Sequence, residues 1–223
     1  MQTDTYATGN NHLTPFAFNN PQLKIEPLFF HLEEQFLLKQ EVDDLCVLLK
    51  NTTLKKLNWD SPDSQLIRGP IGQAITKTSG SGFVDLNEQY TPFDQKIHSK
   101  LLELNNKLFK FDIDCRFTPI YHEYEPNGYF DWHLDNPIAV HGDFIPDNLK
   151  WRKLSMTILL NDWFKGGAFD LITMEQPFKS VKTAQMERGD AIIFPSFLQH
   201  RVNKIEYGTR KSLTYFYCGP RWR

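Results

Sequence analysis

The sequence predicts a mainly β protein, in which helices come first and an antiparallel sandwich or barrel follows. The 223 residues fit one large core better than two. Hydrophobic residues make up 40% of the chain and aromatic residues 14%, which supplies enough apolar surface for a packed interior. Helical periodicity is confined to the first half, whereas the second half consists of short β-type runs separated by turn residues.

Charge and cysteine content narrow the class of protein. The net charge is −2 and charges of both signs are interspersed, so no basic stripe for nucleic acid is present and no such partner is expected. The three cysteines form no CxxC pair, which favours a reducing, cytoplasmic setting over a disulfide framework. Residues 1–20 lack the features of a signal peptide and are expected to form a flexible arm, and no run is long enough for a membrane span.

Two helices are expected before the β-rich half. The first covers about residues 39–50, because apolar residues recur there at helical spacing: Val42, Leu45, Cys46 and Leu49. The second starts with Thr91 as N-cap, Pro92 at the first helical position and Asp94 in the first turn. Its apolar face continues through Ile97, Leu101, Leu104 and Leu108. Residues 25–30 predict an early strand, and residues 60–82 a loop with short strands.

From Arg116 to the end of the chain we expect β-sheet. Runs rich in Phe, Tyr, Ile, Leu, Val and Thr are separated by turn signals at residues 126–128, 166–167, 189–190 and 208. Gly166 and Gly167 are interpreted as a tight turn between strands, because no nucleotide-binding glycine spacing surrounds them.

A candidate metal site begins in the run Tyr129 to Asp135, which predicts a strand. Alternate side chains of a strand share a face, so His133 and Asp135 would project together. Imidazole and carboxylate are ligands of the two-His, one-carboxylate facial triad of non-haem iron, and His200, between two predicted strands, is the candidate third ligand. A second copy of the pattern, His141 with Asp143, is an alternative in a stretch broken by proline and glycine.

A candidate anion site follows in the strand predicted after Gly208. Arg210 and Ser212 would share one face, where a guanidinium and a hydroxyl can bind the same carboxylate. In a buried cleft this pair suits the far carboxylate of a dicarboxylate, although a strand arginine can also be a surface cation. His98 and His122 have no partner at ligand spacing and are expected to have no functional role.

These segments resemble the Fe(II)- and 2-oxoglutarate-dependent oxygenases related to prolyl 4-hydroxylases, including their PKHD-type group. The resemblance covers Arg116 to Arg223 and rests on the order and spacing of four segments: residues 124–135, 152–160, 166–171 and 188–213. It implies a double-stranded β-helix, the jelly-roll or cupin-like barrel. Residues 21–223 would form a single domain, with residues 25–110 as a helical support region and residues 116–223 as the jelly-roll catalytic core.

Carried over residue by residue, the resemblance implies that His133, Asp135 and His200 bind iron and that Arg210 binds the far carboxylate of 2-oxoglutarate. Tyr124 and Ser212 would assist as hydrogen-bond donors. Three residues of one strand would line the co-substrate pocket: Ser155, Thr157 and Leu159. Some relatives carry a tyrosine where Leu159 stands, so the hydrogen bond from that tyrosine is absent here.

The activity that the resemblance implies is hydroxylation of an unactivated C–H bond with Fe(II), 2-oxoglutarate and O2, releasing succinate and CO2, with ascorbate as an optional addition. Asp135 favours hydroxylation, since related halogenases lack this carboxylate. The substrate is a small molecule or a peptidyl residue, and residues 61–82 and 136–150 are candidate substrate loops, the latter a candidate lid. The alternatives are a non-catalytic jelly-roll binding module and a zinc protein with the same ligands.

Overall fold

The computed structural model of the chain describes residues 30–51, 55–56, 76–77, 80–84, 87–135, 150–175 and 178–220. Several expectations lie outside these residues: the arm at residues 1–20, the second pattern at His141 and Asp143, and, except for Lys150, the lid at residues 136–150. The early strand expected at residues 25–30 lies outside them except for Phe30, and a strand is found just after it, at His31–Glu33.

The described strands form two facing sheets and one short pair, all with antiparallel pairing. The larger sheet has the order β1 (His31–Glu33), β12 (Ala191–Pro195), β8 (Trp151–Leu159), β15 (Arg210–Gly219), β6 (Ile120–Tyr124), β4 (Gly80–Phe83) and β2 (Lys55–Lys56), with β5 (Cys115–Arg116) also pairing β15. The smaller sheet has the order β11 (Phe178–Ala184), β10 (Phe169–Glu175), β13 (His200–Val202), β7 (Tyr129–His133) and β3 (Thr76–Lys77). The short pair is β9 (Phe164–Gly166) with β14 (Ile205–Gly208).

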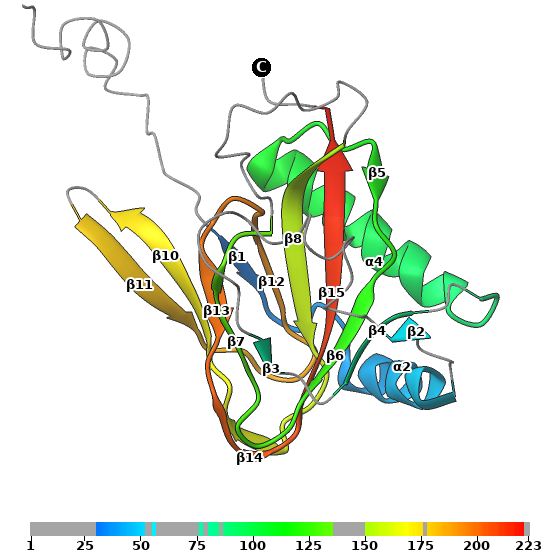
Figure 1. The fold of residues 1–223 in the computed structure, drawn as a ribbon. Coiled ribbons are helices and arrows are strands. Elements are labelled where there is room, and N and C mark those ends of the chain that lie inside the picture. Colours follow the sequence, from blue (N-terminus) through cyan, green and yellow to red (C-terminus); the bar gives the residue numbers. More distant parts are fainter. Residues whose placement is uncertain are drawn as a thin grey trace, which may run out of the picture.

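From β6 onward the chain passes repeatedly between the two sheets, and the hairpin of β10 and β11 stays in the smaller one. β6, β8, β12 and β15 belong to the larger sheet, while β7, β10, β11 and β13 belong to the smaller sheet (Figure 1). The chain therefore winds back and forth across the space between the sheets, which is the topology of a double-stranded β-helix. No strand pairing among the described residues closes the two sheets into one continuous barrel. The predicted fold class is confirmed.

Two helices cover the outer face of the larger sheet (Figure 1). They are α2 (Lys39–Asn51) and α4 (Thr91–Leu104), and a short π-helical turn, η1 (Asn105–Phe109), extends α4. Helix α2 matches its prediction. No helix within the described ranges is long and apolar enough to cross a membrane.

The start of α4 differs from the prediction in its cap. Tyr90 is the N-cap and no side chain caps the helix, whereas Thr91 donates its hydroxyl to the Asn87 carbonyl at 2.9 Å. The Asn87 side chain accepts the N–H groups of Gln89 and Tyr90, each at 3.0 Å, so a turn one step earlier replaces the expected threonine cap.

Side chains of β8 and β15 point alternately to the two faces of the larger sheet. One face packs against the helices and is apolar, and the other faces the smaller sheet and carries polar groups. Leu213, Tyr215 and Tyr217 of β15 belong to the same core cluster as the buried face of both helices, together with three residues of β8: Leu154, Met156 and Ile158. The intervening residues therefore face the smaller sheet. On β15 these are Arg210, Ser212, Thr214 and Phe216, all of them buried. The larger sheet thus presents a row of polar groups to the space between the sheets.

The four predicted turns are confirmed by backbone conformation. Asn127, Gly166, Gly167, Gly189 and Gly208 all have positive φ, in the region that favours glycine and asparagine. The Gly166–Gly167 turn places Gly167 beside Ile205 and Arg210, so it sets the position of the first residue of β15.

Candidate metal centre

Two histidines and one aspartate converge between the sheets. His133 ends β7, His200 begins β13, and the two residues are directly paired across these strands. Asp135 Oδ1 lies 3.6 Å from His133 Nε2, and Asp135 Oδ2 lies 3.4 Å from His200 Nε2. One donor atom from each residue lies within 4.8 Å of the others, the only such group of three within the described ranges. A single cation can therefore be bound by all three side chains.

The prediction that one strand carries both His133 and Asp135 is wrong in its extent. Strand β7 ends at His133, and Asp135 lies in a bend beyond it. The backbone of Asp135 is held instead by two contacts: its N–H donates to the Ser196 carbonyl at 3.1 Å, and its carbonyl accepts Arg152 Nη1 at 3.1 Å. Strand alternation ends at His133, so it cannot place Asp135 beside it. These two backbone contacts instead turn the chain inward and bring the Asp135 side chain to His133.

Backbone carbonyls fix the orientation of both imidazoles. His133 Nδ1 lies 2.7 Å from the Asp131 carbonyl, and His200 Nδ1 lies 2.9 Å from the Leu198 carbonyl. A carbonyl can only accept, so Nδ1 carries the proton in each ring and the Nε2 lone pair points toward Asp135 when the ring is neutral. Burial lowers the pKa of His200 to about 4, which keeps this ring neutral at physiological pH. Such hydrogen bonds behind metal-binding histidines are typical of metal sites.

The carboxylate of Asp135 is held in its charged form. Burial by itself would raise the pKa of Asp135, but the nearby imidazoles of His200 and His133, together with Arg152, outweigh burial and lower this pKa. Two neutral nitrogens and one anionic oxygen match the facial triad that binds non-haem Fe(II) and leaves coordination positions open. The residues present therefore fit an iron ion.

A buried cation lies at the start of β15, on the face turned toward the smaller sheet. Arg210 is only 1% exposed, and no carboxylate of the described residues pairs with it. Arg210 Nη1 donates to Ser212 Oγ at 3.0 Å, and Tyr124 lies opposite Arg210 on β6, with its ring 5.9 Å from the guanidinium carbon. Burial lowers the pKa of Arg210 to about 10, so the group stays charged and an anionic ligand would stabilise it.

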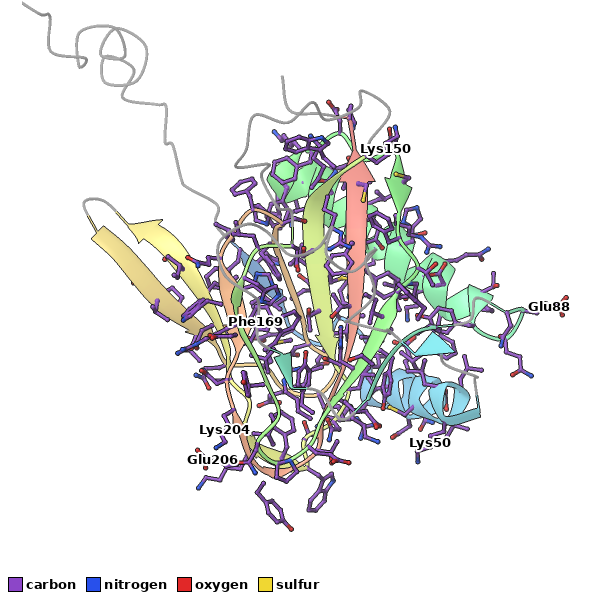
Figure 2. All side chains as sticks on the ribbon, in the orientation of Figure 1. Lys50, Glu88, Lys150, Phe169, Lys204 and Glu206 are labelled. Carbon is purple, nitrogen blue, oxygen red and sulfur yellow. The ribbon has the colours of Figure 1, made fainter. Side chains whose placement is uncertain are left out.

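The metal ligands and Arg210 line one cavity between the sheets. Its polar wall comes from β6 and β15, and its apolar wall from Phe130, Phe169, Val202 and Phe216. Figure 2, which labels Phe169 on β10, shows side chains of both sheets filling the space between them. A metal ion and a small dicarboxylate therefore have separate, complementary binding groups inside one enclosure.

Comparisons with known proteins agree with this geometry. Residues 119–218 match the family model of the 2OG-Fe(II) oxygenase superfamily. A PKHD-type hydroxylase of Thermosynechococcus vestitus is 30% identical over 183 residues, which cover 79% of this chain and 72% of that protein. This chain belongs to the 2OG-Fe(II) oxygenase superfamily. A PKHD-type hydroxylase of Hyphomonas neptunium is 33% identical to the oxygenase over 94 residues, covering 42% of this chain and 39% of that protein.

Solved structures show that the oxygenase has a prolyl 4-hydroxylase-like fold. A prolyl hydroxylase of Trichoplax adhaerens, in complex with a hypoxia inducible factor peptide fragment, superposes with a TM-score of 0.63 at 18% identity, covering 94% of this chain and 90% of that one. A prolyl 4-hydroxylase of Pseudomonas putida gives a TM-score of 0.60 at 16% identity, covering 86% and 93%.

Of the three β8 residues that were predicted to line the co-substrate pocket, only one lines the cavity of the oxygenase. Thr157 lines it and shares a hydrogen bond of 3.2 Å with Thr214, but Ser155 and Leu159 are not among the lining residues. Ser155 is buried against Ser196, with 2.9 Å between the two hydroxyl oxygens. Leu159 ends β8, and its N–H donates to the Asp190 carbonyl at 3.0 Å. The cavity formed by the described residues therefore includes Thr157 but neither Ser155 nor Leu159.

His122 is a cavity residue of the oxygenase that the sequence interpretation missed. It lies on β6 directly opposite Ser212 of β15, is 5% exposed, and lines the cavity that holds Arg210 and the metal ligands. A signal for it was present in the sequence, because His122 stands two residues before Tyr124 and strand alternation places both on one face. His98, in contrast, lies on α4 outside the sheets, where it stacks on Tyr217.

Proposed function

We propose that this oxygenase hydroxylates an unactivated C–H bond in a reaction that converts 2-oxoglutarate and O2 to succinate and CO2. The observation that supports it most is the pairing, within one cavity, of the His133, Asp135 and His200 group with the buried, carboxylate-free Arg210. When bound, Fe(II) and 2-oxoglutarate supply the oxidising chemistry: one oxygen atom of O2 enters succinate and the other enters the substrate as a hydroxyl group.

The residues of the chain supply binding and orientation. His133, His200 and Asp135 would hold Fe(II) through two Nε2 atoms and one carboxylate oxygen. Arg210, with Ser212 and Tyr124 beside it, would hold the far carboxylate of 2-oxoglutarate through charge-assisted hydrogen bonds. Because the metal and the guanidinium are fixed to paired strands, the co-substrate would be held at both ends in one orientation.

The arrangement favours this function over the alternatives. A zinc site with the same three ligands would give no role to a buried Arg210 that lacks an internal carboxylate partner. A non-catalytic binding module would not need two imidazoles with their Nε2 atoms turned toward one carboxylate. Both features are expected when a metal and a dicarboxylate bind together.

The substrate class that we propose is a prolyl or other amino-acid residue of a peptide, with a small molecule as the second candidate. The likeness to a prolyl hydroxylase that binds a peptide fragment supports the first choice. The lid proposed at residues 136–150 would follow directly after Asp135, so a bound substrate could contact both. Ascorbate is proposed only as an optional addition that keeps iron reduced.

Anaerobic binding followed by turnover tests this function. Equilibrium dialysis should show one Fe(II) and, in its presence, one 2-oxoglutarate bound per chain, and both should be lost in His133→Ala and His200→Ala. His141→Ala, in the second His-x-Asp pattern, is the matched control and should bind both. A screen of peptides and small molecules under ¹⁸O2 should then give succinate carrying one ¹⁸O atom and a product heavier by one ¹⁸O atom. Loss of iron in His141→Ala but not in His133→Ala would overturn the assignment.

A further inference from the structure

His122 stands in the middle of a row of side chains that crosses the inner face of the larger sheet. The strand registers pair Leu159 with Ser212, Ser212 with His122, and His122 with Ser81 of β4. Ser212 is the residue that accepts the hydrogen bond from Arg210. His122 therefore lies next to the Arg210 and Ser212 pair, on the side of β15 that faces away from Leu159.

The two ring nitrogens of His122 have different surroundings. Nδ1 lies 2.8 Å from Ser81 Oγ, on the β4 side of the ring. Within the part of the chain that the structure describes, the ring has no other hydrogen bond, and its remaining contact is a stacking of 5.9 Å with Tyr124. The two nitrogens flank Cε1 and point in different directions, so Nε2 is the nitrogen that is left for the cavity that His122 lines.

The charge state of His122 determines what Nε2 can do. Burial, helped by the positive charge of Arg210, lowers the pKa of His122 to about 3, so the ring is neutral and carries one proton. The hydroxyl of Ser81 can donate to Nδ1, which leaves the proton on Nε2. An anion beside Arg210 favours this tautomer, because the other tautomer would direct a lone pair at the anion.

We propose that His122 is a positioning residue for the co-substrate, whose Nε2–H donates to the far carboxylate of 2-oxoglutarate held by Arg210. This inference rests on the proposed function. Ser81 sets the tautomer through Nδ1, so the carboxylate site extends over three strands: β15 with Arg210 and Ser212, β6 with Tyr124 and His122, and β4 with Ser81. Leu159, on the other side of Ser212, has no polar group and offers no such donor.

Substitutions that mimic one ring nitrogen at a time test this role. The amide of His122→Gln reaches the place of Nε2, whereas the amide of His122→Asn reaches only the place of Nδ1. Isothermal titration of 2-oxoglutarate into anaerobic Mn(II)-loaded protein should give a Kd for 2-oxoglutarate that is raised about tenfold or more in His122→Asn. This increase is expected because the variant loses a hydrogen bond to a charged group. His122→Gln should stay within about threefold of the wild type. Mn(II) affinity should be unchanged in both variants.

A co-substrate without the far carboxylate distinguishes positioning from general packing. The affinity for 2-oxobutyrate should be equal in the wild type and in His122→Asn, because this ligand never reaches Arg210. Equal losses for 2-oxobutyrate and 2-oxoglutarate, or no loss for either, would overturn the inference. If the wild type binds Mn(II) but no 2-oxoglutarate, the proposed function fails instead.

A measurement on the wild type avoids any dependence on variant folding. The ¹⁵N chemical shifts of the His122 ring should show the proton on Nε2 in the complex with metal and 2-oxoglutarate. A proton on Nδ1 in that complex would contradict the assignment.

Discussion

The imidazoles of His133 and His200 are prepared for metal binding by the same backbone contact. Each Nδ1 donates to the carbonyl of the residue two positions earlier, Asp131 for His133 and Leu198 for His200. The identity of these ligands could be predicted from the sequence, because residue types and spacing limit the choice. Their tautomers could not be predicted, since they depend on strand ends and turns that only the folded chain defines.

Arg210 gives the most direct prediction at the residue scale. Arg210→Met removes the cationic partner of a buried carboxylate, and we expect 2-oxoglutarate binding to weaken by about 2 to 5 kcal/mol. Lys211→Met is the matched control, because Lys211 lies next in β15, is partly exposed and pairs with Glu123. Titration of 2-oxoglutarate into the metal-loaded variants measures the effect. Equal affinities for the two variants would show that Arg210 does not bind the co-substrate.

His122 also predicts how the stability of the metal-free protein depends on pH. Its pKa is about 3 in the folded protein against an ordinary value of 6.5, so between these values only the unfolded chain binds the proton. The free energy of unfolding therefore falls as pH decreases through this window, by up to about 1.4 kcal/mol per pH unit. In His122→Gln this contribution is absent, and the loss between about pH 7 and about pH 5 should be smaller by about 2 kcal/mol in urea unfolding. An unchanged pH dependence would contradict the neutral, buried state of His122.

His122 shows why some site residues are hard to find in a sequence. Metal-ligand spacing does not identify it, because its partners, Ser81 and Ser212, are far away along the chain and are adjacent to it only through the strand register. Ser155 and Leu159 show the opposite case. They lie on the same face of β8 as Thr157, as strand alternation predicts, but they do not line the cavity. The cavity spans only part of the strand, and its extent depends on the opposite sheet.

At the element scale, the turn after β9 positions the start of β15. Gly167 has φ of +64°, and a Cβ atom there would lie 2.3 Å from Ile205 Cδ1 and 3.0 Å from Arg210 Cδ. Gly166 has φ of +81°, but a Cβ atom there would meet the Lys204 carbonyl at 2.4 Å, on the side of β14. The two glycines therefore constrain different neighbours within one turn.

Alanine substitutions separate these two constraints. Gly166→Ala and Gly167→Ala should each destabilise the protein by about 1 to 3 kcal/mol, because both positions have positive φ. Only Gly167→Ala should also weaken 2-oxoglutarate binding by the folded protein, since its new Cβ displaces Arg210. Denaturant unfolding and calorimetric titration measure the two effects. Equal co-substrate affinities in both variants would show that the turn does not set the position of Arg210.

Element type was easier to predict than element boundaries. Apolar spacing was sufficient for α2, whereas the cap of α4 was misassigned because Asn87 forms a competing turn. The sequence predicts that strand β7 reaches Asp135, but β7 ends at His133, because the Asp135 N–H donates to the Ser196 carbonyl and the Asp135 carbonyl accepts from Arg152. Local patterns determine which element forms, and tertiary contacts determine where it ends.

At the scale of the whole molecule, the fold separates support from chemistry. Helices α2 and α4 pack on one face of the larger sheet (Figure 1). The polar groups that line the cavity lie on the other face of this sheet. The sequence predicts helices before the β-rich half of the chain, but it does not predict which face of which sheet the helices cover. The cross-strand row that unites Ser81, His122 and Ser212 required the three-dimensional register.

We propose that one cavity binds iron through His133, Asp135 and His200 and a dicarboxylate through Arg210. A crystal structure of the anaerobic complex with Fe(II) and 2-oxoglutarate, with data collected at the iron absorption edge, tests it most directly. We predict one anomalous peak bonded to both Nε2 atoms and the Asp135 carboxylate, with the far carboxylate of 2-oxoglutarate on Arg210. A peak at another site, or a co-substrate whose far carboxylate points away from Arg210, would contradict the claim.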